Sequence, residues 1–247
     1  QKYWPVKIYA HIVNHFLRQW DFESSQRPDF FIANSEETKR RINKFYRRDS
    51  DVIYPPVVIP QKITNYQLPT TNYYITLSRL THAKHIEVLI RAANKAQFPL
   101  KIIGSGRDEG ELKAIAGKTV EFLSHIPDEK FKEVFAGAKA FLFASVDEEF
   151  GIAPIEAMGY GIPVISYASG GLKETVQDGV NGYLYTELSE GSLLEKVKIF
   201  EQLSEKKYEE MRKYARSSAE KYSFTEFKKQ ILEYVKTHMK KEKPAVV

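Results

Sequence analysis

Between residues 73 and 185 the chain alternates short apolar runs with longer amphipathic stretches, and this alternation constrains the fold more than any other feature. The apolar runs are rich in β-branched and aromatic residues and are bounded by turn residues, as buried strands are. We expect strands at 73–77, 100–103, 120–123, 140–144, 163–167 and 183–185. We expect helices between them at 85–96, 109–116, 128–138 and 155–160, the last introduced by Pro154, which suits the start of a helix. Strands that alternate with helices predict an α/β fold with a doubly wound parallel sheet.

The chain before this sheet has a different character. Residues 1–60 contain a helical pattern, two short apolar runs and a basic helix that Ser35 caps. A stretch rich in Pro, Asn and Thr follows at 61–72, and this composition is typical of a linker between domains. Helical spacing predicts that one face of the first helix is buried. The residues of that face are Tyr9, Ile12, Val13, Phe16 and Trp20.

The sheet domain is expected to run from 73 to 223 and to be followed by a helix and a basic tail at 224–247. Ser223 and Glu226 form a capping box that opens this last helix. Its spacing predicts four inward residues: Phe227, Ile231, Tyr234 and Val235. The basic tail is interpreted as a solvated end or, alternatively, as a patch that contacts a membrane surface.

The composition limits the class of protein. The 247 residues are 43% apolar, carry a net charge of +5 and include no Cys, which excludes disulfides and thiolate metal sites. The absence of an 18-residue apolar run, of a signal-peptide pattern and of an initiating Met indicates a cytoplasmic segment from within a longer chain, with at most peripheral contact at the inner membrane face. Charges of both signs are interspersed, and no sequence motif of a nucleic-acid-binding protein accompanies them. We therefore expect the ligand to be a nucleotide rather than a nucleic acid.

Ligands on doubly wound sheets bind beyond the carboxyl ends of the strands. That rule brings five loops to one rim: 78–84, 104–107, 124–127, 146–153 and 168–171. Two ways of holding phosphate there stay open. The carboxylates of 147–149 can hold a metal ion. Alternatively, Arg79 and Lys84 can bind the phosphates together with the amides at a helix start around Gly151, without metal.

Other motifs have weaker functional interpretations. Gly104 and Gly106 follow a strand, but the third glycine and the acidic ribose partner of a dinucleotide site are missing, so no cofactor is expected. His11 and His15 share a helical face without nearby ligands, and they are interpreted as surface or packing residues. Glu148 lies in a loop where it can face a reacting group, whereas Glu156, one turn into a helix, suits a ribose diol.

Several of these segments together resemble a known family. Glu148 and Glu156, separated by seven residues and followed by Gly-Ile-Pro-Val-Ile, resemble the signature of family-4 retaining glycosyltransferases of the GT-B fold. Ser78-Arg79-Leu80 with Lys84 resembles the diphosphate clamp of that family. The family's strand-end turn and closing segment are matched by Gly104-Ser105-Gly106, Gly170-Gly171-x-x-Glu174 and the run from Asp178 to Leu184.

The resemblance implies a Rossmann-like donor domain and a role for each site residue. Arg79 and Lys84 would grip the donor diphosphate, and Glu148 would face the sugar; these three are the expected catalytic residues. The backbone of Phe150, Gly151 and Ile152 would contact the donor sugar and phosphates. Glu156 would bind the ribose and Ile126 would lie against the nucleobase. The family needs no cofactor and no bound metal for the transfer.

The likeness to mannosyltransferases of polysaccharide assembly implies transfer of mannose from GDP-mannose to a glycan or lipid-linked acceptor. The chain departs from the family pattern at Ser78 and at Ser124-His125, where glycines are usual, and in carrying only the last part of an N-terminal domain in 1–60. The alternative is therefore a non-catalytic nucleotide-sugar-binding module, or a subunit that needs an N-terminal domain partner. An unpaired edge in 1–60 would also allow pairing with a second copy as a homodimer.

Overall fold

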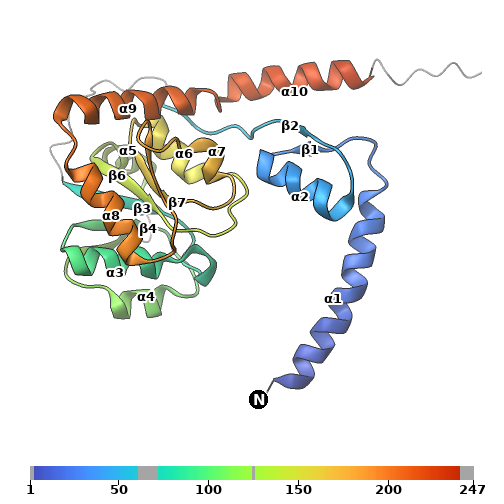
Figure 1. The fold of residues 1–247 in the computed structure, drawn as a ribbon, viewed down its shortest axis with the longest axis horizontal. Coiled ribbons are helices and arrows are strands. Elements are labelled where there is room, and N and C mark those ends of the chain that lie inside the picture. Colours follow the sequence, from blue (N-terminus) through green and yellow to red (C-terminus); the bar gives the residue numbers. More distant parts are fainter. Residues whose placement is uncertain (1–2, 61–71, 124–125, 240–247) are drawn as a thin grey trace, which may run out of the picture. The chain divides into compact units, whose positions relative to one another are not determined.

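The computed structural model describes residues 3–60, 72–123 and 126–239, and it divides into two compact units, Gln1–Tyr54 and Pro55–Val247 (Figure 1). The predicted linker 61–72 lies, except for Asn72, outside the described residues, as do Ser124, His125 and the basic tail from 240 onward. None of the helices within the described ranges combines the length and the apolar character needed to span a membrane.

Unit 2 is built on a six-stranded sheet in which all strands are parallel. The strands are β3 (Tyr73–Leu77), β4 (Leu100–Ile103), β5 (Val120–Leu123), β6 (Ala138–Phe143), β7 (Val164–Tyr167) and β8 (Gly182–Tyr185). Their order across the sheet is β5-β4-β3-β6-β7-β8. The chain therefore winds outward from β3 to one edge and then returns to β6, beside β3, to wind toward the other edge. This confirms the doubly wound α/β fold and puts the point of reversal between β3 and β6.

Helices cover both faces of the sheet (Figure 1). The helices of unit 2 are α3 (Ile86–Ala96), α4 (Glu109–Ile115), α5 (Asp128–Ala136), α6 (Ile152–Gly159), α7 (Leu172–Thr175), α8 (Glu190–Glu201), α9 (Glu205–Glu220) and α10 (Phe224–Met239), with a 3₁₀ turn η1 at His82–Lys84. Helices α3 and α8 pack against each other and on one face, whereas α6 packs on β6 and β7 and against α9. Because both faces are covered, four consecutive residues of β3, 73–76, are buried.

Two arginines of α9 hold the carboxyl end of α6. The Nε of Arg212, which is only 4% exposed, donates to the carbonyl of Gly161 at 3.1 Å. Arg216 donates to the carbonyl of Gly159 and, at 2.7 Å, to that of Pro60. Cations at this end complement the partial negative charge of the α6 carbonyls. They thereby fix the direction in which the opposite end of α6 points.

The predicted start of α6 is wrong by three residues. The helix begins at Ile152 rather than Ile155, and its N-cap is Gly151 with φ of 87°. Pro154 is thus the third helical residue and not the first. A helix tolerates proline there as well, because no amide of the first turn has a partner within the helix. The short elements η1 and α7 were not expected, since three or four residues show no periodicity.

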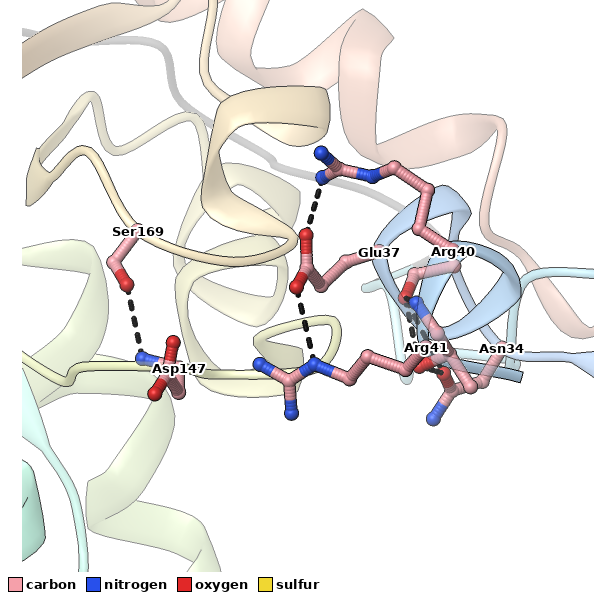
Figure 2. Close-up of polar contacts among 8 residues, drawn as sticks. Asn34, Glu37, Arg40, Arg41, Asp147 and Ser169 are labelled. Carbon is pink, nitrogen blue, oxygen red and sulfur yellow. Dashed lines mark hydrogen bonds and ion pairs between the residues drawn. The ribbon is translucent and has the colours of Figure 1, made fainter. Parts of the chain in front are cut away.

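Unit 1 contains α1 (Trp4–Ser25), β1 (Ile32–Ala33), α2 (Glu36–Tyr46) and β2 (Asp51–Val52), with the two strands parallel. The Ser35 cap is confirmed, because its Oγ accepts from the Thr38 amide at 3.0 Å. In α2, Glu37 pairs with Arg40 and, at 3.0 Å, with Arg41, which steadies the basic helix (Figure 2).

The expected burial of the α1 face is wrong within the described residues. Tyr9 is 70% exposed, Phe16 64% and Trp20 63%. A unit whose two strands have two residues each offers no apolar surface broad enough to cover this helix. The inward face expected for α10 is likewise only half-buried, and its Val235 is exposed.

Two glycines of neighbouring segments give a test of the backbone packing below the rim. Gly104 has φ of 136°, and a Cβ there would lie 2.0 Å from the Ser78 carbonyl oxygen. Gly110 lies in α4, and a Cβ added there would have no neighbouring atom within 4 Å. We expect Gly104→Ala to lower the free energy of unfolding by about 1–3 kcal/mol or more. Gly110→Ala should raise it by about 0.5–1 kcal/mol. Urea denaturation measures the free energy of unfolding of both variants. Equal changes in the two variants would contradict the close packing of Gly104 against the Ser78 carbonyl.

Candidate functional site

The strand order determines which loops meet. Strands β3 and β6 are hydrogen-bonded neighbours, but the connections that leave their carboxyl ends diverge to opposite faces of the sheet. A crevice opens at such a point in doubly wound sheets. The segment after β3 carries Arg79 and Lys84, and the segment after β6 carries Ser145 and Glu148. Two predicted site segments are therefore brought together by the topology.

Lys84, Glu148 and Ser145 form one polar cluster. The Lys84 Nζ lies 2.5 Å from Glu148 Oε2 and donates to Ser145 Oγ at 3.3 Å, while Ser145 Oγ donates to the same Glu148 oxygen at 2.7 Å. About a quarter of each charged side chain is exposed, 26% for Lys84 and 23% for Glu148. Ser145 itself is buried. The pair thus holds a cation and an anion at the rim with a fixed geometry that remains accessible to a ligand.

Ser145 was missed by sequence reasoning. A serine near the end of a strand has no periodicity or spacing that marks it, and its position two residues after β6 was the signal available.

The backbone around Glu148 is held by the loop after β7. The Gly171 amide donates to the Glu148 carbonyl at 2.8 Å, and Ser169 Oγ accepts from the Asp147 amide at 2.9 Å (Figure 2). Gly170 has φ of 55°, and a Cβ there would lie 2.0 Å from the Glu148 carbonyl oxygen. Only glycine allows this approach. Ser169 was also missed, although the adjacent glycine pair had marked its loop.

The loop after β3 is fixed in a similar way by the loop after β4. The Leu80 amide donates to the Ser105 carbonyl at 3.0 Å, and a Cβ on Gly106 would lie 2.2 Å from the Leu80 carbonyl oxygen. The two glycines of this turn therefore serve close backbone packing, which agrees with the rejection of a dinucleotide fingerprint. This packing fixes the backbone at Leu80, next to Arg79.

The amino end of α6 faces the same loop system. Gly151 is its N-cap, so the first helical amides are those of Ile152 and Ala153, and Pro154 has none. Such amides, with the helix dipole, favour an anion. The Phe150 side chain is 3% exposed and packs edge-on against Tyr222, with ring centroids 5.2 Å apart. Phe150 can therefore offer a ligand its backbone but not its ring. The Ile152 side chain, in contrast, is 47% exposed.

Glu156 lies one turn into α6 in a less polar environment. Burial raises the pKa of its carboxyl above the usual value of 4.5. Its neighbours Ile155 and Ala157 are fully buried. Within the described part of the chain its carboxylate has neither a hydrogen bond nor an ion pair. Hydroxyl donors on a ligand would offset the cost of keeping this charge partly out of water.

The remaining predicted residues are less constrained. Arg79 is exposed, and only its carbonyl takes part in hydrogen bonds, from the Thr81 amide at 3.0 Å and the Ser78 hydroxyl at 3.3 Å; among the described residues its guanidinium has no partner. Ile126 is half-buried in the segment after β5. Across 3–60, 72–123 and 126–239, no three His, Asp or Glu side chains are grouped so that they could hold a metal ion. The carboxylates of 147–149 therefore give no support to the metal-bound alternative, and neither do His11 and His15.

Comparison with known proteins identifies the family. The model of the family "Glycosyl transferases group 1" matches residues 60–218. A curated relative, the GtfA subunit of the UDP-N-acetylglucosamine–peptide N-acetylglucosaminyltransferase of Streptococcus gordonii, is 32% identical over 187 residues, which are 69% of this chain and 36% of that protein. The chain thus spans about a third of the length of this relative.

Solved structures agree on the fold. The pneumococcal O-GlcNAc transferase GtfA in complex with UDP and GlcNAc has a TM-score of 0.72 at 24% identity, over 88% of this chain and 47% of that one. A crystal structure of the GtfA/B complex gives the same values. HepE of Anabaena in complex with UDP and glucose has a TM-score of 0.73 at 22% identity, over 86% and 64% of the two chains. The parallel sheet, the loops gathered at its switch point and the match over most of unit 2 lead to one conclusion: the chain belongs to the group 1 glycosyltransferase family and carries the C-terminal, Rossmann-like domain of the GT-B fold.

Proposed function

We propose that unit 2 binds a nucleoside diphosphate sugar at the rim between β3 and β6, as the donor half of a glycosyltransferase. The observation that carries this proposal is the cluster of Lys84, Glu148 and Ser145 at the switch point of the sheet. The cluster offers a cation for phosphate and a carboxylate for sugar hydroxyls within one hydrogen-bonded group.

Each part of the rim has a chemical task in this proposal. Arg79 and Lys84 bind the diphosphate, and the first amides of α6 add donors and a positive dipole end. Charge that develops on the leaving diphosphate is stabilised by these fixed groups, without a metal ion. Glu148 accepts hydrogen bonds from the sugar, and the Lys84 ammonium, which contacts Glu148 and Ser145 in the structure, is shared between the carboxylate and the phosphate when the donor binds.

The nucleoside is held by the other two predicted contacts. Glu156 accepts from the ribose hydroxyls, which suits a carboxylate that burial has left without a protein partner in the described residues. Ile126 lies against the base. The departure at Ser78, where the family has glycine, lies directly beside Arg79 in the segment that holds the diphosphate.

For the donor we propose a UDP-sugar carrying N-acetylglucosamine or glucose. The similar proteins support this choice, because the streptococcal relatives are UDP-N-acetylglucosamine transferases and HepE was solved with UDP and glucose. None of these relatives supports the GDP-mannose that the sequence resemblance had implied.

Transfer to a glycan, lipid-linked or peptide acceptor requires more than unit 2 provides. We propose that the anomeric configuration is retained, as the sequence resemblance implies, and that an N-terminal domain supplies the acceptor side. The alternative is a nucleotide-sugar-binding subunit that acts with a partner chain. The GtfA/B complex is a structural precedent for that arrangement.

Calorimetry with UDP, UDP-N-acetylglucosamine, GDP and GDP-mannose in EDTA tests the donor site. We expect the uridine ligands to bind and Arg79→Ala to weaken them about tenfold or more, since a charge-assisted hydrogen bond contributes about 1.5–3 kcal/mol. Lys84→Ala should cost more, because it also leaves Glu148 facing the phosphates without its counter-charge. Lys84→Ala combined with Glu148→Gln should recover part of that loss.

The matched controls are Arg91→Ala and Lys118→Ala, exposed cations on α3 and before β5. Both should bind UDP like the unmodified chain. Affinity for none of the four nucleotides, with the fold intact by circular dichroism, would refute the donor site. Preference for GDP-mannose would overturn the UDP assignment alone.

Glu156→Gln tests the ribose contact through opposite effects on stability and binding. Because burial raises the Glu156 pKa, the unfolded chain releases this proton first as pH rises above about 4.5, so ionisation costs the folded state stability. The variant should therefore have a higher Tm than the unmodified chain at pH 7, and a smaller loss of stability between pH 4.5 and 7. It should weaken UDP binding more than 2′-deoxy-UDP binding, since the amide offers fewer acceptor sites.

Glu111→Gln, an exposed carboxylate of α4, is the control and should change neither the pH dependence nor the affinity. Equal losses for UDP and 2′-deoxy-UDP would contradict a contact between Glu156 and the 2′-hydroxyl. A lower Tm would contradict the desolvation argument.

A further inference from the structure

A pocket lies at the end of the sheet opposite to the rim. It has a volume of about 660 Å³, which is in the range that holds a small ligand. Its walls come from the residues just before β3 and β4, from the carboxyl end of α3 and from α8. The side chains that matter here are Asn72, Tyr74, Gln97, Phe98, Leu194 and Gln202.

This pocket is separate from the proposed donor site. Asn72 precedes β3 and Arg79 follows it, and five residues of strand lie between the two positions. At about 3.3 Å per residue the two sites are roughly 16 Å apart or more. A ligand in the pocket therefore cannot share contacts with a nucleotide on the rim.

The pocket has a rigid aromatic wall. Phe98 is half-buried and packs against the buried Tyr74, with ring centroids 4.7 Å apart. The Tyr74 hydroxyl donates to Glu201, which also pairs with Lys139. These contacts hold Tyr74 in place, and Tyr74 in turn steadies the Phe98 ring that packs against it. A partly exposed, supported ring of this kind is a platform for the apolar face of a ligand.

The polar lining favours a ligand without net charge. Three charged side chains line the pocket: the exposed lysines Lys95 and Lys198 and the carboxylate of Glu201. The two positive charges are offset by this carboxylate and by the partial negative charge of two helix ends, that of α3 at Ala96 and that of α8 at Glu201. Three side-chain amides, those of Asn72, Gln97 and Gln202, add groups that both donate and accept hydrogen bonds. Neither sign of charge dominates, and the amides match hydroxyl groups.

We propose that this pocket binds an uncharged, polyhydroxylated ligand, namely a short segment of oligosaccharide, with one sugar ring stacked on Phe98 and its hydroxyls bonded to the surrounding amides. Such binding adds a glycan-holding site to the chain that is independent of donor binding at the rim. Because a single ring and three amides form most of the contact, the affinity is expected in the millimolar range.

Saturation-transfer NMR on the full chain tests this with two probes, N,N′-diacetylchitobiose and maltose. We expect transfer from the protein to at least one of them, strongest at the ring protons that face Phe98. Phe98→Ala should abolish the transfer. Ala96→Trp should do the same by filling the pocket, and it removes nothing from the core because Ala96 is exposed.

The matched control is Ala114→Trp, an exposed alanine of α4 outside the pocket, which should leave the transfer unchanged. Lys84→Ala should also leave it unchanged, so that failure of the donor site and failure of this proposal are distinguished. Absence of transfer from both saccharides would overturn the proposal, as would transfer that persists in Ala96→Trp. Displacement of the saccharide by inorganic phosphate would reveal an anion site instead.

Discussion

Strands β3 and β6 are hydrogen-bonded neighbours whose connections diverge to opposite faces of the sheet, and every part of the candidate site depends on that reversal. It brings Lys84, from the segment after β3, to Glu148 and Ser145, from the segment after β6, although more than sixty residues separate them in sequence. Glycines then fix the two loops by close backbone approach: Gly106 against Leu80 on one side and Gly170 against Glu148 on the other. The charged pair therefore rests on backbone packing that few other residues would permit.

Helix α6 connects this rim to the rest of the unit. Its amino end supplies the amides of Ile152 and Ala153, and its carboxyl end is held by Arg212 and Arg216 of α9. Glu156 lies between these ends, where burial raises its pKa and opposes its ionisation. A site that keeps a carboxylate partly out of water gives up some stability, and a ligand with hydroxyl donors recovers it. This is a physical reason for expecting a ribose at this position.

Much of the sheet could be predicted from sequence, because buried strands such as Tyr73–Leu77 and amphipathic helices such as Ile86–Ala96 have strong periodic patterns. The strand order, and with it the contact between Lys84 and Glu148, needed the tertiary structure, although the rule for strand ends had included the two loops that carry these residues. Ser145 and Ser169 were not singled out, since their positions near strand ends were the only signal and a single serine carries no periodic pattern. The face of α1 was misjudged for the opposite reason: periodicity shows which side chains share a face but not what covers them.

The central claim is that a nucleoside diphosphate binds at the reversal between β3 and β6. A crystal structure of the chain with UDP tests it most directly. The account predicts the diphosphate at the first amides of α6 and within hydrogen-bonding distance of Lys84, with the ribose hydroxyls on the Glu156 carboxylate. A nucleotide found elsewhere, for example in the pocket beside Phe98 at the other end of the sheet, with Lys84 and Glu148 paired as they are here, would contradict it.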